Sequence, residues 1–179
     1  MVLRNIFHAS GSLIPIIYFY FGKKEALFLS LTFFLLISLV EFVRIKGLLK
    51  LKALESFIRE RERKRPTGSF FFTLASSLVI LLFEERIAIP SLLVVSFSDP
   101  FAAYVGEHLG KRKFKGRSFE GSCGFFLVTL CILLLWDEGI QKSLIVSFIS
   151  TLTEFFSVEI DDNLTVPLST ALCLRLINF

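Results

Sequence analysis

The chain has 179 residues, 54% of them hydrophobic and 22 of them Phe, and its formal net charge is +4. Its apolar residues come in runs that charges interrupt only at intervals, whereas a soluble domain spreads them at amphipathic spacing. A basic excess in such a chain is explained more simply by membrane topology than by nucleic-acid binding. We therefore expect no nucleic-acid partner and interpret the chain as a polytopic integral membrane protein.

Seven apolar runs follow one another along the chain, and each predicts a membrane-spanning helix. They cover residues 8–21, 26–42, 68–83, 87–105, 121–136, 143–157 and 164–179. Several are at or below the roughly 17–25 apolar residues that a span requires, so we expect short, tilted or interrupted helices. There is no internal repeat or linker, so residues 1–179 are expected to form one domain. The predicted fold is an all-α transmembrane bundle of about seven spans.

The three cysteines all fall inside apolar runs, at Cys123, Cys131 and Cys173. They show no CxxC spacing and have no His neighbours, so neither a disulfide framework nor a zinc site is indicated. We expect them to be small, buried side chains.

The basic residues are distributed unevenly between the two membrane faces. When the connections are assigned alternately to the two faces, one face holds 15 of the 20 Lys and Arg residues, namely Arg4, nine within 44–65 and five within 111–117. The positive-inside rule places this face, together with the N-terminus, in the cytoplasm. An odd number of spans then places the C-terminus outside.

Four residues near the basic face are candidates for contacts with phosphate groups or lipids: Arg4, His8, Arg44 and Arg65. Arg4 and His8 lie one helical turn apart at the membrane edge, and Arg44 forms either a local ion pair with Glu41 or a phosphate contact. Arg65 ends a charge run that is either a solvated, topology-determining segment or a basic surface for nucleotide phosphates or anionic lipid heads.

The fourth predicted span contains an acid on a face of small residues. Asp99, Ala103, Gly106 and Gly110 recur at helical spacing. Small residues let a ligand approach the backbone beside a carboxylate, or let another helix pack closely. An ionisable residue inside a span is costly, and packing does not need one, so Asp99 favours the functional interpretation.

Five of the seven residues from Lys111 to Arg117 are cations. The next span then opens with Ser118, Glu120 and Gly121. Cations neutralise a phosphate, and the free N–H groups of a helix N-terminus bind it. In the alternative interpretation, Ser118 is an N-cap, Glu120 interacts with the helix dipole and the cations only determine topology.

Four acids and an Asn lie within 154–163, on the same predicted face as these cations. Carboxylate oxygens suit Mg²⁺, which also binds substrate phosphates and water. The alternative is a turn and cap formed by Asp161, Asp162 and Asn163. Because three clusters that are distant in sequence converge on one face, beside helices open to lipid, they indicate metal-assisted phosphoryl or nucleotidyl transfer to a lipid.

These motifs resemble the CTP-dependent lipid-alcohol kinases: dolichol kinase, phytol and farnesol kinases, and the yeast-type diacylglycerol kinase. The resemblance covers nearly the whole chain. Its most specific motifs are Arg117-Ser118-Phe119-Glu120-Gly121 and Glu154 with Asp161-Asp162-Asn163 before Val166-Pro167-Leu168. Asn5 stands where that family often has Lys, and Arg117 where it usually has Lys, but cations remain beside both.

The resemblance implies an integral membrane kinase that transfers the γ-phosphate of CTP to a lipid alcohol, with Mg²⁺ as cofactor. Its active site would face the cytoplasm, in the cell membrane of a prokaryote or the endoplasmic reticulum of a eukaryote. The implied catalytic residues are Asp99, Asp161 and Asp162, and the implied metal ligands are these three with Glu154. The implied nucleotide-binding residues are Gly106, Gly110, Lys111, Arg117, Ser118, Glu120, Gly121 and Asn163.

Two alternatives are weighed against this assignment. Phosphatidate cytidylyltransferases share the Ser-Asp and Ser-x-Glu-Gly elements, but they are generally larger and end in a signature that this sequence lacks. A small transporter or assembly protein without catalysis is the second alternative. Against it, the polar residues gather at one face and do not line a path across the membrane.

Overall fold

The computed structural model describes residues 11–47, 62, 65–111, 113–114, 116–157 and 160–177. Within these residues it contains seven α-helices and one short two-stranded sheet. The elements are α2 (Leu13–Phe21), α3 (Lys23–Ile45), α5 (Gly68–Leu82), α6 (Glu85–His108), β1 (Lys113–Phe114), β2 (Arg117–Ser118), α7 (Phe119–Leu135), α8 (Ile140–Phe156) and α9 (Asp162–Ile177). Each predicted apolar run overlaps one helix, which confirms the all-α prediction.

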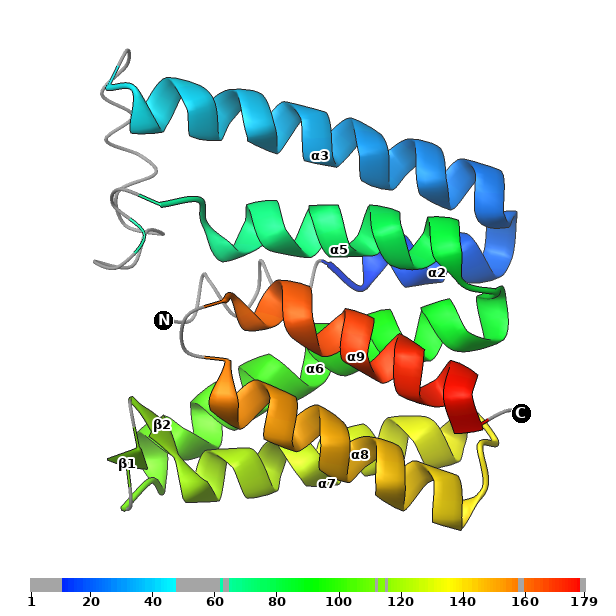
Figure 1. The fold of residues 1–179 in the computed structure, drawn as a ribbon, viewed down its shortest axis with the longest axis vertical. Helices are drawn as coiled ribbons and strands as arrows, with labels where there is room; N and C mark the ends of the chain where they lie inside the picture. Colours follow the sequence, from blue (N-terminus) through cyan, green and yellow to red (C-terminus); the bar gives the residue numbers. More distant parts are fainter. Residues whose placement is uncertain are drawn as a thin grey trace.

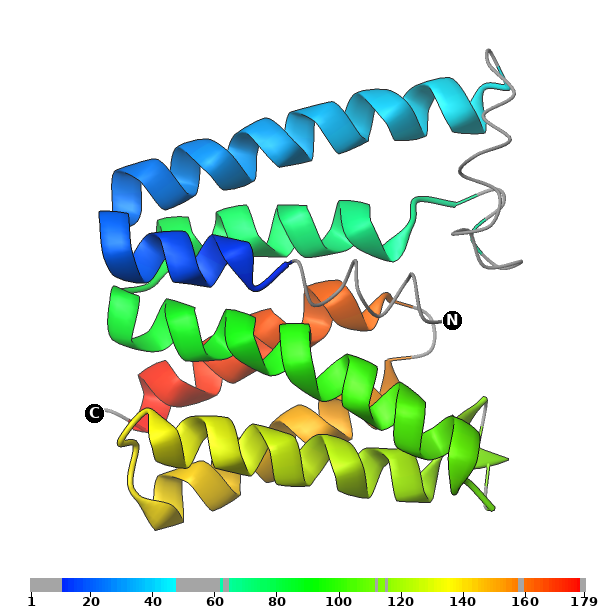
Figure 2. The same ribbon diagram turned by 180° about the vertical axis from the view of Figure 1, so that it is seen from behind.

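The helices lie alongside one another, and their ends gather at two opposite ends of the bundle (Figure 1). At one end of the bundle, the C-terminal ends of α3, α6 and α8 meet the N-terminal ends of α5, α7 and α9. We call it the acidic end, because the buried carboxylates Asp99, Glu154 and Asp162 lie there. The turns α2–α3, α5–α6 and α7–α8 lie at the opposite end, as the view from behind also shows (Figure 2). The connections therefore alternate between two ends, as the assignment to two membrane faces requires.

Two of the described helices, α3 and α6, are long and apolar enough to cross a membrane. They differ in their surroundings, because α6 is mostly buried in the bundle whereas α3 is mostly exposed and packs on α2 and α5. Helices α5 and α7 are apolar but shorter, with 15 and 17 residues. An arrangement of seven spans therefore remains a prediction.

The outer surface of the bundle is rich in large apolar side chains. On α3 alone, Phe28 is 74% exposed, Leu35 66% and Leu39 63%. Soluble monomers seldom leave such a patch uncovered, so this surface favours contact with lipid acyl chains. The same surface explains why one expectation was wrong: Cys123 and Cys131 are exposed on α7. In such a bundle an apolar run does not distinguish the inner from the outer face of a helix.

Small polar side chains join neighbouring helices inside the bundle. Hydroxyl pairs connect Ser30 with Ser77 at 3.2 Å, Ser98 with Thr129 at 3.0 Å and Ser150 with Thr170 at 2.7 Å. Hydrogen bonds of this kind support helix association where water is scarce. They fix the packing of α3 on α5, of α6 on α7 and of α8 on α9.

A proline-related contact fixes the opposite end. Pro90 in α6 has no N–H, so the Arg86 carbonyl one turn earlier loses its helical donor. The indole Nε1 of Trp136, at the end of α7, donates to that carbonyl at 3.0 Å. This hydrogen bond replaces the missing one and ties α7 to the start of α6.

Candidate functional site

Three buried carboxylates from three helices meet at the acidic end. Asp99 comes from α6, Glu154 from α8 and Asp162 from α9, and their side chains are all buried. Each offers an oxygen that lies within 4.8 Å of the others. We call these three residues the carboxylate trio. The structure thus brings together acids that lie up to 63 residues apart in sequence, and their spacing suits ligation of one metal ion.

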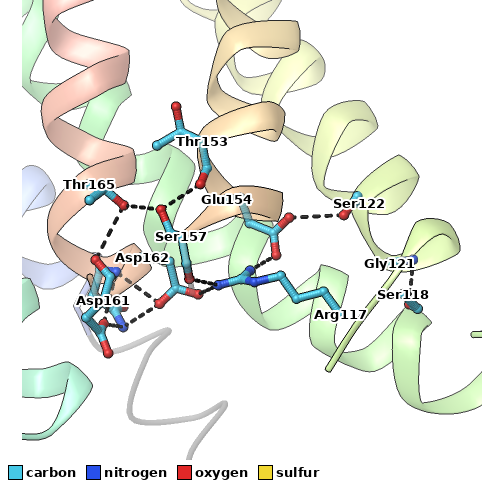
Figure 3. Close-up of polar contacts among 11 residues, drawn as sticks. Arg117, Ser118, Gly121, Ser122, Thr153, Glu154, Ser157, Asp161, Asp162 and Thr165 are labelled. Atoms are coloured by element: carbon cyan, nitrogen blue, oxygen red, sulfur yellow. Dashed lines mark hydrogen bonds and ion pairs between the residues drawn. The ribbon is translucent and has the colours of Figure 1, made fainter. Parts of the chain in front are cut away.

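Arg117, from strand β2, reaches Glu154 and Asp162, two members of the carboxylate trio (Figure 3). Its guanidinium forms an ion pair with Glu154 and donates to Asp162 Oδ2 at 2.5 Å and to the Ser157 carbonyl at 3.2 Å. Ser122 Oγ donates to the other carboxylate oxygen of Glu154 at 3.1 Å. One guanidinium is therefore shared between two of the three carboxylates.

The position of Arg117 follows from a β-hairpin. Strands β1 and β2 pair antiparallel with Phe114 opposite Arg117, so these two side chains project from the same face. Gly116 in the turn has φ +88°, a conformation that favours glycine. Phe114 stacks on Phe155, with ring centroids 5.6 Å apart. The hairpin is therefore docked on the end of α8 by an aromatic pair beside the ion pair to Glu154.

The start of α7 confirms the N-cap interpretation of Ser118, whose Oγ accepts the Gly121 N–H at 3.0 Å. The same region is a tight contact between α6 and α7. A Cβ on Gly106 would lie 2.6 Å from Ser118 Oγ, and one on Gly110 would lie 2.8 Å from Ser118 Cβ. A Cβ on Gly121 would lie 2.8 Å from the Ala102 carbonyl oxygen.

These small residues thus serve helix packing, the alternative that the sequence left open. Contact of Gly106, Gly110, Ser118 or Gly121 with a nucleotide remains a prediction. Lys111, three residues after the end of α6, is exposed, and Glu120 lies in the first turn of α7.

The residues Asp161 and Asp162 have different environments. Asp161 Oδ1 accepts the backbone N–H of Asn163 at 3.1 Å and its side-chain Nδ2 at 2.7 Å, which caps the start of α9. Asp161 is not a member of the carboxylate trio, whereas Asp162 is. The turn-and-cap interpretation therefore describes Asp161. Among the residues that the structure describes, the three acids whose geometry matches the metal-ligand prediction are Asp99, Glu154 and Asp162.

Asn163 contributes an unusual atom beside the trio. The residue is 3% exposed, and its Nδ2 lies 2.7 Å from a Cβ built on Gly68, so α5 and α9 approach closely there. Nδ2 also donates to Asp162 Oδ1 at 3.3 Å. Its Oδ1 is buried and has no hydrogen-bond partner among the residues that the structure describes. A buried amide oxygen in this state calls for a donor or a cation.

A second polar network ties α3 to α5. Arg44 forms an ion pair with Glu41 and donates to the carbonyls of Glu62 at 3.0 Å and Arg65 at 2.6 Å. Glu41 Oε1 accepts from Thr67 Oγ1 at 2.9 Å, directly before α5. The Glu41–Arg44 pair is therefore present, and it positions the start of α5. Phosphate contacts of Arg44 and Arg65 remain predictions, and Arg4 and His8 lie outside the described residues.

Two partners of the site were missed by the sequence analysis: Ser122, which bonds Glu154, and Ser157, whose carbonyl accepts from Arg117. Ser122 follows Ser118 by one helical turn, and this spacing is a signal that it shares the face of the N-cap. The contact of Ser157 uses a backbone atom, for which no sequence signal exists.

Comparison with known proteins identifies several relatives. The chain is 30% identical to the uncharacterized protein RP860 of Rickettsia prowazekii, over 94% of this chain and 90% of that protein. It is 31% identical to CTP-dependent diacylglycerol kinase 1 of Schizosaccharomyces pombe, over 67% of this chain and 64% of that kinase. It is 30% identical to a probable chloroplastic phytol kinase of Triticum aestivum, over 66% of this chain and 47% of that protein.

The alignments thus span less than two thirds of each of these two kinases, although they span nearly all of the Rickettsia protein. No protein-family model and no solved structure matches the chain.

Proposed function

We propose that the chain, which belongs to the family of CTP-dependent lipid kinases, is an integral membrane kinase that transfers the γ-phosphate of CTP to the hydroxyl of a lipid alcohol. The acceptor class comprises polyprenols such as dolichol, phytol-type alcohols and diacylglycerol. The observation that carries the proposal is the meeting of three buried carboxylates and Arg117 at one end of an apolar bundle.

The carboxylate trio fits Mg²⁺ by its own chemistry. Three buried carboxylate oxygens lie close enough to share one ion, and Arg117 contributes one positive charge to them. Asn163 Oδ1, which has no hydrogen-bond partner among the described residues, belongs to the residue beside Asp162. Asp99, Glu154 and Asp162 would hold the ion, which supplies charge neutralisation to the transferred phosphoryl group.

The chain's own residues would bind and orient the reactants. Lys111 and Arg117 are proposed to bind phosphate oxygens, and Ser122 holds Glu154 in place. The remaining proposed nucleotide contacts are Gly106, Gly110, Ser118, Glu120, Gly121 and Asn163. The hydroxyl of the lipid alcohol enters laterally between helices and loses its proton to a carboxylate. The cap role of Asp161 favours Asp99 or Asp162 as that acceptor. Positioning and charge stabilisation dominate this type of transfer.

A labelling experiment with purified protein tests the reaction. Label in the γ-phosphate of CTP should move to one member of a panel of lipid alcohols, leaving CDP, as the γ-phosphorus forms a bond to the alcohol oxygen. A phosphatidate cytidylyltransferase would instead release pyrophosphate and transfer the α-label to a CDP-lipid. Absence of both transfers, with every acceptor class tested, would support the non-enzymatic alternative.

The acidic end is proposed to face the cytoplasm, where CTP is available, because the basic residues are concentrated on that face of the predicted topology. The test uses Lys113→Cys, in the hairpin, and Glu84→Cys, at the opposite end, in a background without native cysteines. Both positions are exposed. In intact cells an impermeant maleimide should label position 84 but not position 113. Labelling at 113 alone would reverse the orientation.

A further inference from the structure

Arg117 binds the residues that are proposed to hold the metal. The sequence assigns Arg117 to the phosphate of the nucleotide, yet its guanidinium contacts Glu154 and Asp162 Oδ2. Its side chain is only 15% exposed, so these contacts are made away from bulk water. One side chain therefore reaches two of the three carboxylates of the trio.

A guanidinium and a divalent cation compete for such oxygens. Glu154 Oε2 accepts from Ser122 at 3.1 Å, and Glu154 Oε1 accepts from Arg117. A cation that binds Oε1 would therefore have to displace Arg117. Buried carboxylates require a counter-charge, and either cation supplies it. Guanidinium also binds phosphate and carboxylate with the same planar, two-donor geometry, so Arg117 has a second acceptor available when phosphate is present.

We propose that Arg117 is an exchangeable counter-ion, which holds Glu154 and Asp162 until a divalent cation enters the trio and then binds the nucleotide phosphate. This inference rests on the proposed function. The backbone of the hairpin need not move, because Phe114 stacks on Phe155 beside Glu154 and keeps strand β2 in place. Asn163 Oδ1, next to Asp162, has no hydrogen-bond partner in the part of the chain that the structure describes, which independently indicates that this end accommodates a further group. Arg117 thus couples cation binding to phosphate binding.

The test measures the binding of Mn²⁺ alone, without nucleotide, to the purified full chain in detergent, with free Mn²⁺ quantified by electron paramagnetic resonance. Arg117→Gln should bind Mn²⁺ about tenfold more tightly than the wild type, because a competing positive charge has been removed. The matched control is Lys113→Gln, which removes a cation from an exposed position of the same hairpin. It should change the affinity by no more than about twofold, because solvent screens its charge.

Unchanged or weaker Mn²⁺ binding by Arg117→Gln would overturn the exchange, since an arginine that only supports the site leaves it weaker when removed. If that variant does not fold, Arg117→Lys decides. Its ammonium lacks the planar, two-donor fork of a guanidinium and should hold the two carboxylates less firmly. The Mn²⁺ affinity of Arg117→Lys should therefore exceed that of the wild type, and an equal or lower affinity overturns the proposal.

The outcome also separates this inference from the proposed function. If the wild type transfers the γ-label and binds Mn²⁺, but Arg117→Gln binds it no better, only the exchange fails. If neither protein binds Mn²⁺, the metal site and the exchange fail together. A rise in the KM for CTP in Arg117→Gln, together with tighter Mn²⁺ binding, would support both halves of the exchange.

Discussion

Both ends of the bundle carry ion pairs near their helix termini, but these pairs differ in sequence separation and in burial. At the acidic end, Arg117 pairs with carboxylates 37 and 45 residues away, and both are buried. At the opposite end, Lys142 pairs with Glu138 one turn away. Arg175, whose side chain is 45% exposed, pairs with Glu84, whose side chain is 73% exposed. A cavity of about 490 Å³ opens between these latter pairs.

This difference shows which charges need an explanation. The exposed pair Arg175–Glu84 costs little and contributes little. Lys142–Glu138 is less exposed, at 27% and 9%, but it is a local pair one helical turn apart, in which each charge already has its partner. Burying several carboxylates together costs several kcal/mol per ion unless cations compensate it. The acidic end therefore carries a free-energy cost of charge burial that packing does not require. The opposite end, with the open cavity, carries no comparable cost among the described residues.

The first prediction tests the buried charges. Asp99→Asn and Asp162→Asn keep the size of the side chain and remove its charge, so each should lower turnover by at least about 100-fold, the scale of losing one electrostatic contact to a transition state. Protein yield should be nearly unchanged. The measurement is transfer of the γ-label from CTP, with Glu84→Gln at the opposite end as the control. Near-normal turnover in both variants would remove the trio from the chemistry.

The second prediction tests the packing beneath the site. Gly121→Ala places a Cβ 2.8 Å from the Ala102 carbonyl oxygen and from Ser118 Oγ, so α6 and α7 must separate. We expect a loss of about 1–3 kcal/mol in the free energy of unfolding, as for other overpacked interiors. Denaturant unfolding in detergent measures it. Cys123→Ala, on the exposed side of the same helix, should have little effect; an equal loss there would mean that the close contact is unimportant.

The sequence predicted the helices well because each apolar run is long and bounded by charges or turn residues. It also singled out Asp99, Glu154 and Asp162 as candidates, which the structure places close together, since an acid inside or beside an apolar run is rare enough to stand out. It could not separate Asp161 from Asp162. Adjacent residues at a helix start point in different directions, but the sequence does not say which direction faces the neighbouring helices.

The hairpin that carries Arg117 was also not predicted. Its strands have two residues each and lie in a run of cations with no alternation of apolar and polar residues. Its register is set by docking, through Phe114 on Phe155 and Arg117 on Glu154, and these contacts join distant parts of the chain. The local pattern therefore indicated that this segment is positively charged but did not predict that it forms a β-hairpin.

The third prediction separates the two neighbouring acids at the start of α9. Asn is as good an N-cap as Asp, so Asp161→Asn should keep the cap and leave turnover within about threefold of the wild type. The same change at Asp162 removes a member of the trio and is expected to have the large effect given above. Both variants are assayed together by γ-label transfer. If Asp161→Asn loses as much activity as Asp162→Asn, Asp161 takes part in the chemistry and its capping bond to Asn163 is secondary.

The smallest effect is expected at the opposite end. Arg175→Gln removes the ion pair with Glu84, whose two side chains are largely exposed, so solvent and salt already screen the attraction. The free energy of unfolding should change by less than about 0.5 kcal/mol, and turnover should not change. Denaturant unfolding at low and high salt, with the γ-label assay on the same preparation, measures both. A large loss of turnover would mean that the opposite end contributes to the reaction. The contrast between buried and exposed charges would then no longer identify the functional end.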